Sequence, residues 1–291
     1  MKTSVFLISY KEHWNSPGKN IKTTLELVKQ NGFDAAEPCY AHELKGPEGS
    51  ENAKGVKDTA ERLGIDFSCF SHGINLLDRE RDEVVQELKW CVDMAKVLGA
   101  PYLHHTFQLT CSQKNLPLYN KYKNTFVDIA KEVAYYAGEN GIECIYEDQG
   151  YLMNTPERMC ELLHEVNLPN TGICLDVGNA LFYDTEPEVY AGILSSYVKH
   201  VHIKDYLRKP LEMLPSKKGW SSSISGNGLR GTIIGHGAIN FEKVFSVLLL
   251  GGYDGYFSLE YEGKEDTLPA VVESLNNMKY FYDRAYKKIN G

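Results

Sequence analysis

The sequence has no apolar run approaching the roughly 20 residues that a helix needs to cross a bilayer. We therefore expect no membrane partner. The first residues, MKTSVFLISYKEHW, include a short apolar run, but no small-residue cleavage site follows it. This beginning is typical of a first strand rather than of a signal peptide.

Paired cysteine spacing is also missing. The seven cysteines are odd in number and irregularly spaced, and no CxxC motif occurs. This pattern does not indicate a disulfide framework or a cysteine-rich zinc site. Because several cysteines lie in apolar runs, we expect reduced core cysteines in a cytoplasmic protein.

Positive charge is the third deficit. The 31 Lys and Arg residues are outnumbered by 39 Asp and Glu residues, which gives a net charge of −8. An acidic surface argues against a nucleic-acid or anionic-membrane partner. No glycine-rich phosphate loop follows the first apolar run, which argues against a doubly wound open sheet.

What the 291 residues do contain is an alternation of short apolar runs with longer amphipathic ones. Eight strands followed by eight helices predict an α/β protein, a single (β/α)8 TIM barrel spanning residues 1–291. The expected strands are 5–10, 33–39, 66–72, 102–106, 142–148, 172–178, 198–205 and 255–261. The expected helices are 20–31, 51–63, 80–98, 120–140, 155–165, 187–195, 240–250 and 267–287.

Residues 206–239 break this alternation and show no clear strand or helix. We predict an inserted loop after the seventh strand, on the side where such barrels place their active sites. A loop of this length is usually functional or mobile. Its serine- and glycine-rich part, 216–228, is equally compatible with a disordered surface insertion.

The stretch VKHVHIKDY, residues 198–206, combines strand periodicity with histidines on one face. Because side chains alternate along a strand, His200, His202 and Lys204 share a face opposite Val201 and Ile203. The two apolar residues suit the side packed by helices, so the histidines point into the barrel. Barrel interiors are mostly apolar, and inward imidazoles need partners, of which a metal ion is one.

Three further strands end in carboxylates, at Glu147, Asp176 and Glu260. A single strand-end carboxylate is more often a solvated loop residue or a helix cap. Together with an imidazole at one barrel mouth, however, three carboxylates form a mixed oxygen and nitrogen site. Such a site suits one divalent ion, with Mn²⁺ favoured and Mg²⁺, Co²⁺ or Zn²⁺ as alternatives.

Several motifs resemble the xylose-isomerase-like sugar phosphate isomerase/epimerase superfamily, which also includes endonuclease IV. The resemblance covers nearly the whole chain and is more specific for the superfamily than for a substrate. It implies a xylose-isomerase-like TIM barrel, with Glu147, Asp176, His202 and Glu260 as metal ligands and the two glutamates as the acid/base pair. The motifs are IYEDQG (145–150), CLDVGNAL (174–181), KHVHIKD (199–205), RGTIIGHGAINF (230–241) and SLEYEG (258–263).

The resemblance also suggests substrate contacts. Arg230 corresponds to a substrate-binding arginine, although its segment has one more residue than the family pattern. His236 stands where acidic or small residues are common. Asn179 replaces a histidine found in free-ketose 3-epimerases and in endonuclease IV, which weakly favours a phosphorylated substrate.

Other candidates for substrate binding come from their places in the predicted strands. His72 and His105 end strands three and four, where they either contact substrate hydroxyls or are structural. Lys204 either neutralises a phosphate or carboxylate or forms a salt bridge. Tyr10 follows strand one and either walls the pocket or belongs to an ordinary loop, and the inward-facing Glu37 binds a ligand or a neighbouring strand.

These residues predict a divalent-metal-dependent sugar or sugar-phosphate isomerase or epimerase of the ketose 3-epimerase type. The chemistry is a metal-stabilised enediolate, with Glu147 and Glu260 moving the proton. The alternative is a dehydratase of the inosose or dehydroshikimate type. An endonuclease IV-like zinc phosphodiesterase is disfavoured by Asn179 and the acidic charge. The expected partner is a small-molecule sugar or sugar phosphate, and homo-oligomerisation is left open.

Overall fold

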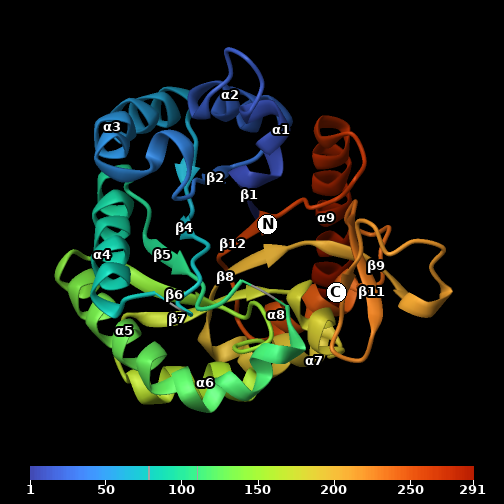
Figure 1. Ribbon diagram of the computed structural model, residues 1–291. Helices are drawn as coiled ribbons and strands as arrows, with labels where there is room; N and C mark the ends of the chain where they lie inside the picture. The colour runs from blue at the N-terminus through green and yellow to red at the C-terminus, as the bar shows by residue number, and fades with distance from the viewer. Residues whose placement is uncertain (78, 110) are drawn as a thin grey trace.

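A closed barrel of parallel strands forms the centre of the computed structural model, which describes residues 1–77, 79–109 and 111–291 (Figure 1). The sheet order is β3-β2-β1-β12-β8-β7-β6-β5-β4, and a parallel bridge between Cys39, just after β2, and Ser71 of β4 closes the barrel. The strands are β1 (Lys2–Phe6), β2 (Ala35–Glu37), β3 (Asp66–Phe67), β4 (Phe70–His72), β5 (Tyr102–His105), β6 (Glu143–Glu147), β7 (Thr171–Asp176), β8 (Val198–Ile203) and β12 (Tyr256–Leu259). Because β3 and β4 are two halves of one interrupted barrel strand, the predicted (β/α)8 barrel is confirmed.

Helices surround this sheet, as Figure 1 shows. Capping residues in the sequence determine where helices begin and end. The Thr155 side chain accepts a hydrogen bond from the backbone N–H of Arg158 at the start of α6, and Gly32 ends α2 in a left-handed conformation. The helices are α1 (Lys11–Trp14), α2 (Ile21–Asn31), α3 (Gly46–Leu63), α4 (Arg81–Leu98), α5 (Tyr119–Glu139), α6 (Pro156–Val166), α7 (Pro187–Leu194), α8 (Phe241–Leu250) and α9 (Thr267–Asn290). No helix among these described residues is long and apolar enough to cross a membrane.

The first strand lies earlier in the chain than predicted. It pairs with β12 from Lys2 opposite Tyr256 to Val5 opposite Leu259, and it ends at Phe6. The apolar residues that follow, Leu7–Tyr10, form a 3-10 helix instead of continuing the strand. An apolar run alone cannot locate this boundary, because the partner strands determine where pairing stops.

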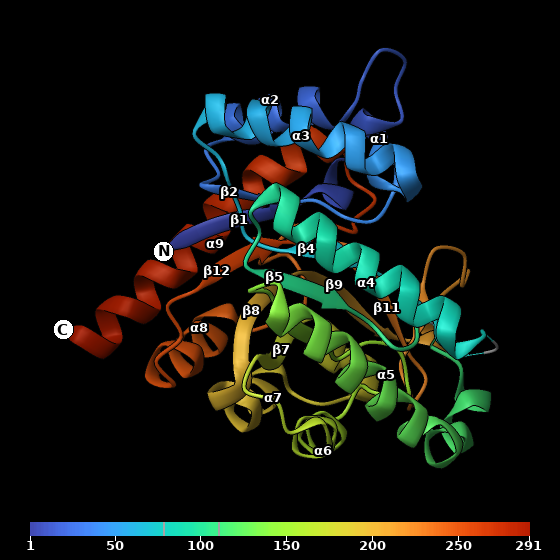
Figure 2. The same ribbon diagram turned by 90° about the vertical axis from the view of Figure 1, so that its left-hand side faces the viewer.

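The segment predicted to be an unstructured loop after the seventh barrel strand contains a small antiparallel sheet of order β10-β11-β9. Its strands are β9 (Asp205–Pro210), β10 (Ser221–Ser222) and β11 (Asn227–Thr232). The expectation of no regular structure is therefore wrong for these residues. Figure 2 places the β9–β11 hairpin at the end of the barrel opposite both termini, beyond the carboxyl ends of the barrel strands.

The inside of the barrel is layered. One layer is apolar and is formed by Cys69, Ile145 and Cys174, with Tyr102 packed against them. Side chains on one face of a strand are two residues apart. The next layer toward the carboxyl ends therefore contains Glu147, two residues after Ile145, and Asp176, two residues after Cys174. That layer is polar, and it forms the candidate site.

Candidate metal centre

The polar layer consists of buried ionisable side chains contributed by five barrel strands and the two segments that directly follow β8 and β12. None of these residues is more than 5% exposed. An apolar barrel interior is the usual arrangement, so a buried set of this kind needs mutual or external partners. Its members are Glu37, His104, Glu147, Asp176, His202, Lys204 and Glu260.

The structure brings the four residues predicted as metal ligands together. Ligand atoms of Glu147, Asp176, His202 and Glu260 all lie within 4.8 Å of one another. The Nδ1 atom of His202 is 3.3 Å from Oε1 of Glu147 and 3.3 Å from Oε2 of Glu260. This spacing can hold one ion between three carboxylates and one imidazole.

Two carboxylate oxygens of this group have surroundings that suit a bound cation. Oδ2 of Asp176 and Oε2 of Glu260 are buried and accept no hydrogen bond from the described residues. The Lys204 ammonium lies 2.6 Å and 3.0 Å from these oxygens as an ion pair, without the angles of a hydrogen bond. Buried carboxylate oxygens without donors, next to an imidazole nitrogen, fit a divalent ion with oxygen and nitrogen ligands.

Lys204 is fixed in this layer by its acidic neighbours. Burial opposes its charge, but the carboxylates of Asp176, Glu260 and Glu262 outweigh burial and raise the pKa of Lys204 well above its ordinary value. Its positive charge is thereby balanced at the floor of the site.

Glu37 lies behind His202 rather than in the cavity. Its Oε1 atom is 2.8 Å from Nε2 of His202, and its Oε2 atom is 2.8 Å from Nε2 of His200. The hydroxyls of Ser258, at 2.7 Å, and of Ser71 also donate to this carboxylate. Burial favours the neutral acid, but both histidines outweigh it and hold the pKa of Glu37 well below its usual range. The carboxylate is saturated by protein donors, so it orients His202.

His104 joins the cluster although the sequence pointed to its neighbour. Its Nε2 atom lies 3.2 Å from Oε2 of Glu147, while the ring of His105 packs outside the sheet, 5.1 Å from the rings of Phe107 and Tyr146. Strand register could have identified His104, because it pairs with Ile145, which shares a face with Glu147.

Three other predicted substrate contacts also lie elsewhere. His72 turns outward, where its Nε2 atom is 2.7 Å from Oε1 of Glu87 on α4. Tyr10 is buried, and its hydroxyl accepts a hydrogen bond from Asn31 at 2.7 Å. His236 is half exposed and pairs with Glu273 of α9 at 3.1 Å. The sequence around each of these three residues does not show these contacts, because the partners lie 15 or more positions away in the chain.

A cavity of about 480 Å³ opens above the cluster. The predicted contacts Asn179, Lys204 and Arg230 all line it, together with Trp220 of the inserted segment. Asn179 connects the cavity to the cluster, since its Nδ2 atom is 3.4 Å from Oε1 of Glu147. The volume is suited to a ligand of sugar size.

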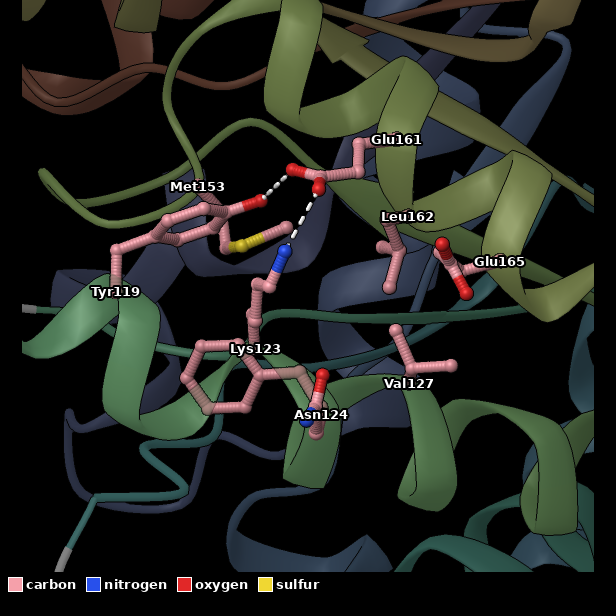
Figure 3. Close-up of a pocket in the computed structure, with 9 residues that line it drawn as sticks. Tyr119, Lys123, Asn124, Val127, Met153, Glu161, Leu162 and Glu165 are labelled. Atoms are coloured by element: carbon pink, nitrogen blue, oxygen red, sulfur yellow. Dashed lines mark hydrogen bonds and ion pairs between the residues drawn. The ribbon is translucent and has the colours of Figure 1, made fainter.

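A second, smaller cavity lies between α5 and α6 and has a volume of about 60 Å³ (Figure 3). Figure 3 shows Lys123 and Tyr119 both directed at Glu161, and the Lys123 ammonium is 2.9 Å from this carboxylate. No residue of the buried cluster lines it. Lys204 of the cluster lines the larger cavity instead, so the larger cavity is the candidate binding site.

Known proteins share this fold and this length. The sequence pattern of the family described as "Xylose isomerase-like TIM barrel" matches residues 25–281. The chain belongs to this family. An inosose dehydratase of Bacillus cereus (strain AH820) is 24% identical over 278 residues, which cover 89% of this chain and 92% of that protein.

Two solved structures resemble this family member over almost its entire length. A D-tagatose 3-epimerase-like protein superposes with a TM-score of 0.75 at 20% identity, covering 99% of this chain and 100% of the other. The IOLI protein, solved with a bound zinc atom, also gives a TM-score of 0.75 at 20% identity and covers 99% of each chain. At these identities the likeness shows the fold.

Proposed function

We propose that this protein is a metal-dependent enzyme that removes the proton next to the carbonyl group of a polyhydroxy ketone. Its first candidate activity is that of a sugar or sugar-phosphate isomerase or epimerase. The observation that supports this proposal is the convergence of Glu147, Asp176, His202 and Glu260 beneath a sugar-sized cavity at the carboxyl ends of the strands.

Glu147, Asp176, His202 and Glu260 would hold one divalent ion. We propose Mn²⁺, and Mg²⁺, Co²⁺ and Zn²⁺ suit the same donors; the related IOLI protein was solved with zinc. When bound, the ion supplies positive charge that stabilises the negative charge developing on a substrate oxygen.

The two glutamates would move the proton. They reach the cluster from β6 and from the end of β12, which are separated in the sheet by β7 and β8, so their carboxylates approach a substrate from different sides. Burial opposes ionisation of Glu147, but His104 and His202 outweigh it and hold the pKa of Glu147 well below its ordinary value. An ionised carboxylate is ready to accept a proton. If the second glutamate returns a proton to the opposite face, the carbon is inverted.

Dehydration is the second candidate activity. The relatives over most of the chain include inosose dehydratases, and Lys204 supports the same chemistry. Its ammonium lies 3.0 Å from Oε2 of Glu260 at the cavity floor, where its positive charge can stabilise the negative charge that develops on a departing hydroxyl group. The first step, removal of the proton next to the carbonyl, is shared with epimerisation.

A panel of ketoses, ketose phosphates and inososes, incubated with Mn²⁺ in D₂O and followed by NMR, tests the proposal. An epimerase incorporates deuterium at the carbon that it inverts. A dehydratase instead releases water and converts the hydroxy ketone into an enol, which tautomerises to a dione. Absence of both solvent exchange and product from the whole panel, with the metal shown to be bound, would overturn the proposed reaction.

A further inference from the structure

The rim of the large cavity carries cations that no carboxylate among the described residues neutralises. Lys11, Arg230 and Lys264 line the cavity, and within the described residues their side chains form no ion pair with a carboxylate. Arg208, on the same hairpin, shows the contrast, since its guanidinium lies 2.8 Å from Asp184. Three unpaired cations around one cavity are notable in a chain of net charge −8.

The charges at the floor of the cavity, in contrast, are balanced. The Lys204 ammonium is paired with Asp176 at 2.6 Å and with Glu260 at 3.0 Å. Higher in the cavity, Glu262 is the acidic residue of the described lining, with a side chain that is 41% exposed. Its carboxylate accepts a hydrogen bond from the Tyr206 hydroxyl at 2.6 Å and lies 3.7 Å from Lys204, so one carboxylate faces three cations at the rim. The excess positive charge is therefore confined to the rim.

The inserted hairpin holds part of this rim in place. The Arg230 guanidinium lies over the ring of Trp220, 4.8 Å from its centre, and this contact orients the planar group. β11 passes so close to the segment after β12 that a side chain at Gly231 would collide with the carbonyl oxygen of Glu262. The stem of Lys264 lies 3.7 Å from the position of a Cβ atom on Gly219, next to Trp220.

We propose that the substrate carries an anionic group, a phosphate or a carboxylate, which Lys11, Arg230 and Lys264 bind at the rim while the reacting ketone lies at the floor. This inference rests on the proposed function for the position of the ketone. It assigns anion binding to the rim rather than to Lys204, because the charge of Lys204 is already balanced by buried carboxylates. The inserted segment thereby contributes to substrate selection.

Calorimetric titration of the protein loaded with Mn²⁺ tests this assignment with matched probes. D-fructose 6-phosphate is compared with D-fructose, and 3-dehydroshikimate is compared with its uncharged methyl ester. At least one anionic probe should bind about tenfold more tightly than its neutral counterpart, and the advantage should shrink as NaCl is raised. Which of the two anionic probes is preferred distinguishes a phosphate from a carboxylate.

The double substitution R230M/K264M should lose about tenfold more affinity for the preferred anionic probe than for its neutral counterpart. The matched control is K209M, which removes an exposed charge from the same hairpin and should bind both probes as the parent protein does. Equal binding of anionic and neutral probes by the parent protein, or an unchanged preference in the double variant, would overturn the inference. If no probe reacts but the anion preference is lost in the double variant, the rim site stands and the proposed reaction falls.

Discussion

The Nε2 atom of His202 lies 2.8 Å from Oε1 of Glu37, so a buried carboxylate stands directly behind a candidate metal ligand. A carboxylate in this place fixes the tautomer and orientation of the imidazole. With Nε2 engaged, Nδ1 is the atom presented to Glu147 and Glu260. The pair connects strand β2 to strand β8 across the barrel.

We predict that E37Q weakens Mn²⁺ binding by about 10- to 100-fold, the usual range for loss of such a partner. The amide keeps the size of the side chain, but its NH₂ group cannot accept the hydrogen bonds that Glu37 now accepts. Metal titration of the apo protein measures this effect without any substrate.

E143Q is the matched control for this substitution. Glu143 begins β6, and its carboxylate pairs with Lys199 at 3.3 Å, outside the buried cluster. The control should bind Mn²⁺ as the parent protein does. If E37Q also keeps the parent affinity, Glu37 has no role in holding His202 for the metal.

Lys204 should oppose metal binding, because its ammonium lies within 3.0 Å of two proposed ligand oxygens. K204M removes that positive charge and leaves Asp176 and Glu260 without a counter-charge in the apo protein. We expect the variant to bind Mn²⁺ at least about threefold more tightly and to gain more thermal stability on adding Mn²⁺. Metal titration and thermal unfolding with and without Mn²⁺ measure both effects, and weaker binding would show that Lys204 instead positions the ligands.

The sequence predicts the barrel and its strand-end carboxylates well, because both follow from short-range periodicity. It selects His105 over His104 because YLHHT places two histidines in succession without an apolar alternation to fix the phase of the strand. The donors around Glu37 are equally hidden, since Ser71, His200 and Ser258 come from separate strands that only barrel closure brings together. The sequence does not predict strands β9 and β11, because few of their residues are apolar and no strand periodicity results.

His105 should make the folded protein less stable as the pH falls. Burial lowers the pKa of His105 from its ordinary value of 6.5 to about 3. Between these values the unfolded chain binds a proton at this position and the folded protein does not, so stability falls as the pH falls, by up to about 1.4 kcal/mol per pH unit. H105F removes this contribution, and its free energy of unfolding should therefore decline less steeply between pH 6.5 and 3.

Denaturant unfolding at several pH values measures how the free energy of unfolding changes with pH in the parent protein and in H105F. The comparison uses the slope rather than the absolute stability, because H105F also loses the contact of Nδ1 with the carbonyl oxygen of Thr106, which is 3.0 Å long. Parallel pH profiles for the two proteins would contradict the prediction.

The last prediction separates the two glutamates. E147Q and E260Q each keep an oxygen that can bind a metal but lose the group that carries the proton. We expect each variant to stay folded, to retain some Mn²⁺, and to lose at least about 10²-fold in turnover, the usual scale for a general acid or base. Solvent exchange distinguishes them: the variant that lacks only the group returning the proton still incorporates deuterium from D₂O without inverting the carbon. Near-normal turnover in both would mean that these carboxylates act only as ligands. The proton would then pass through another group of the buried cluster, with the His104 imidazole, 3.2 Å from Glu147, the first to test.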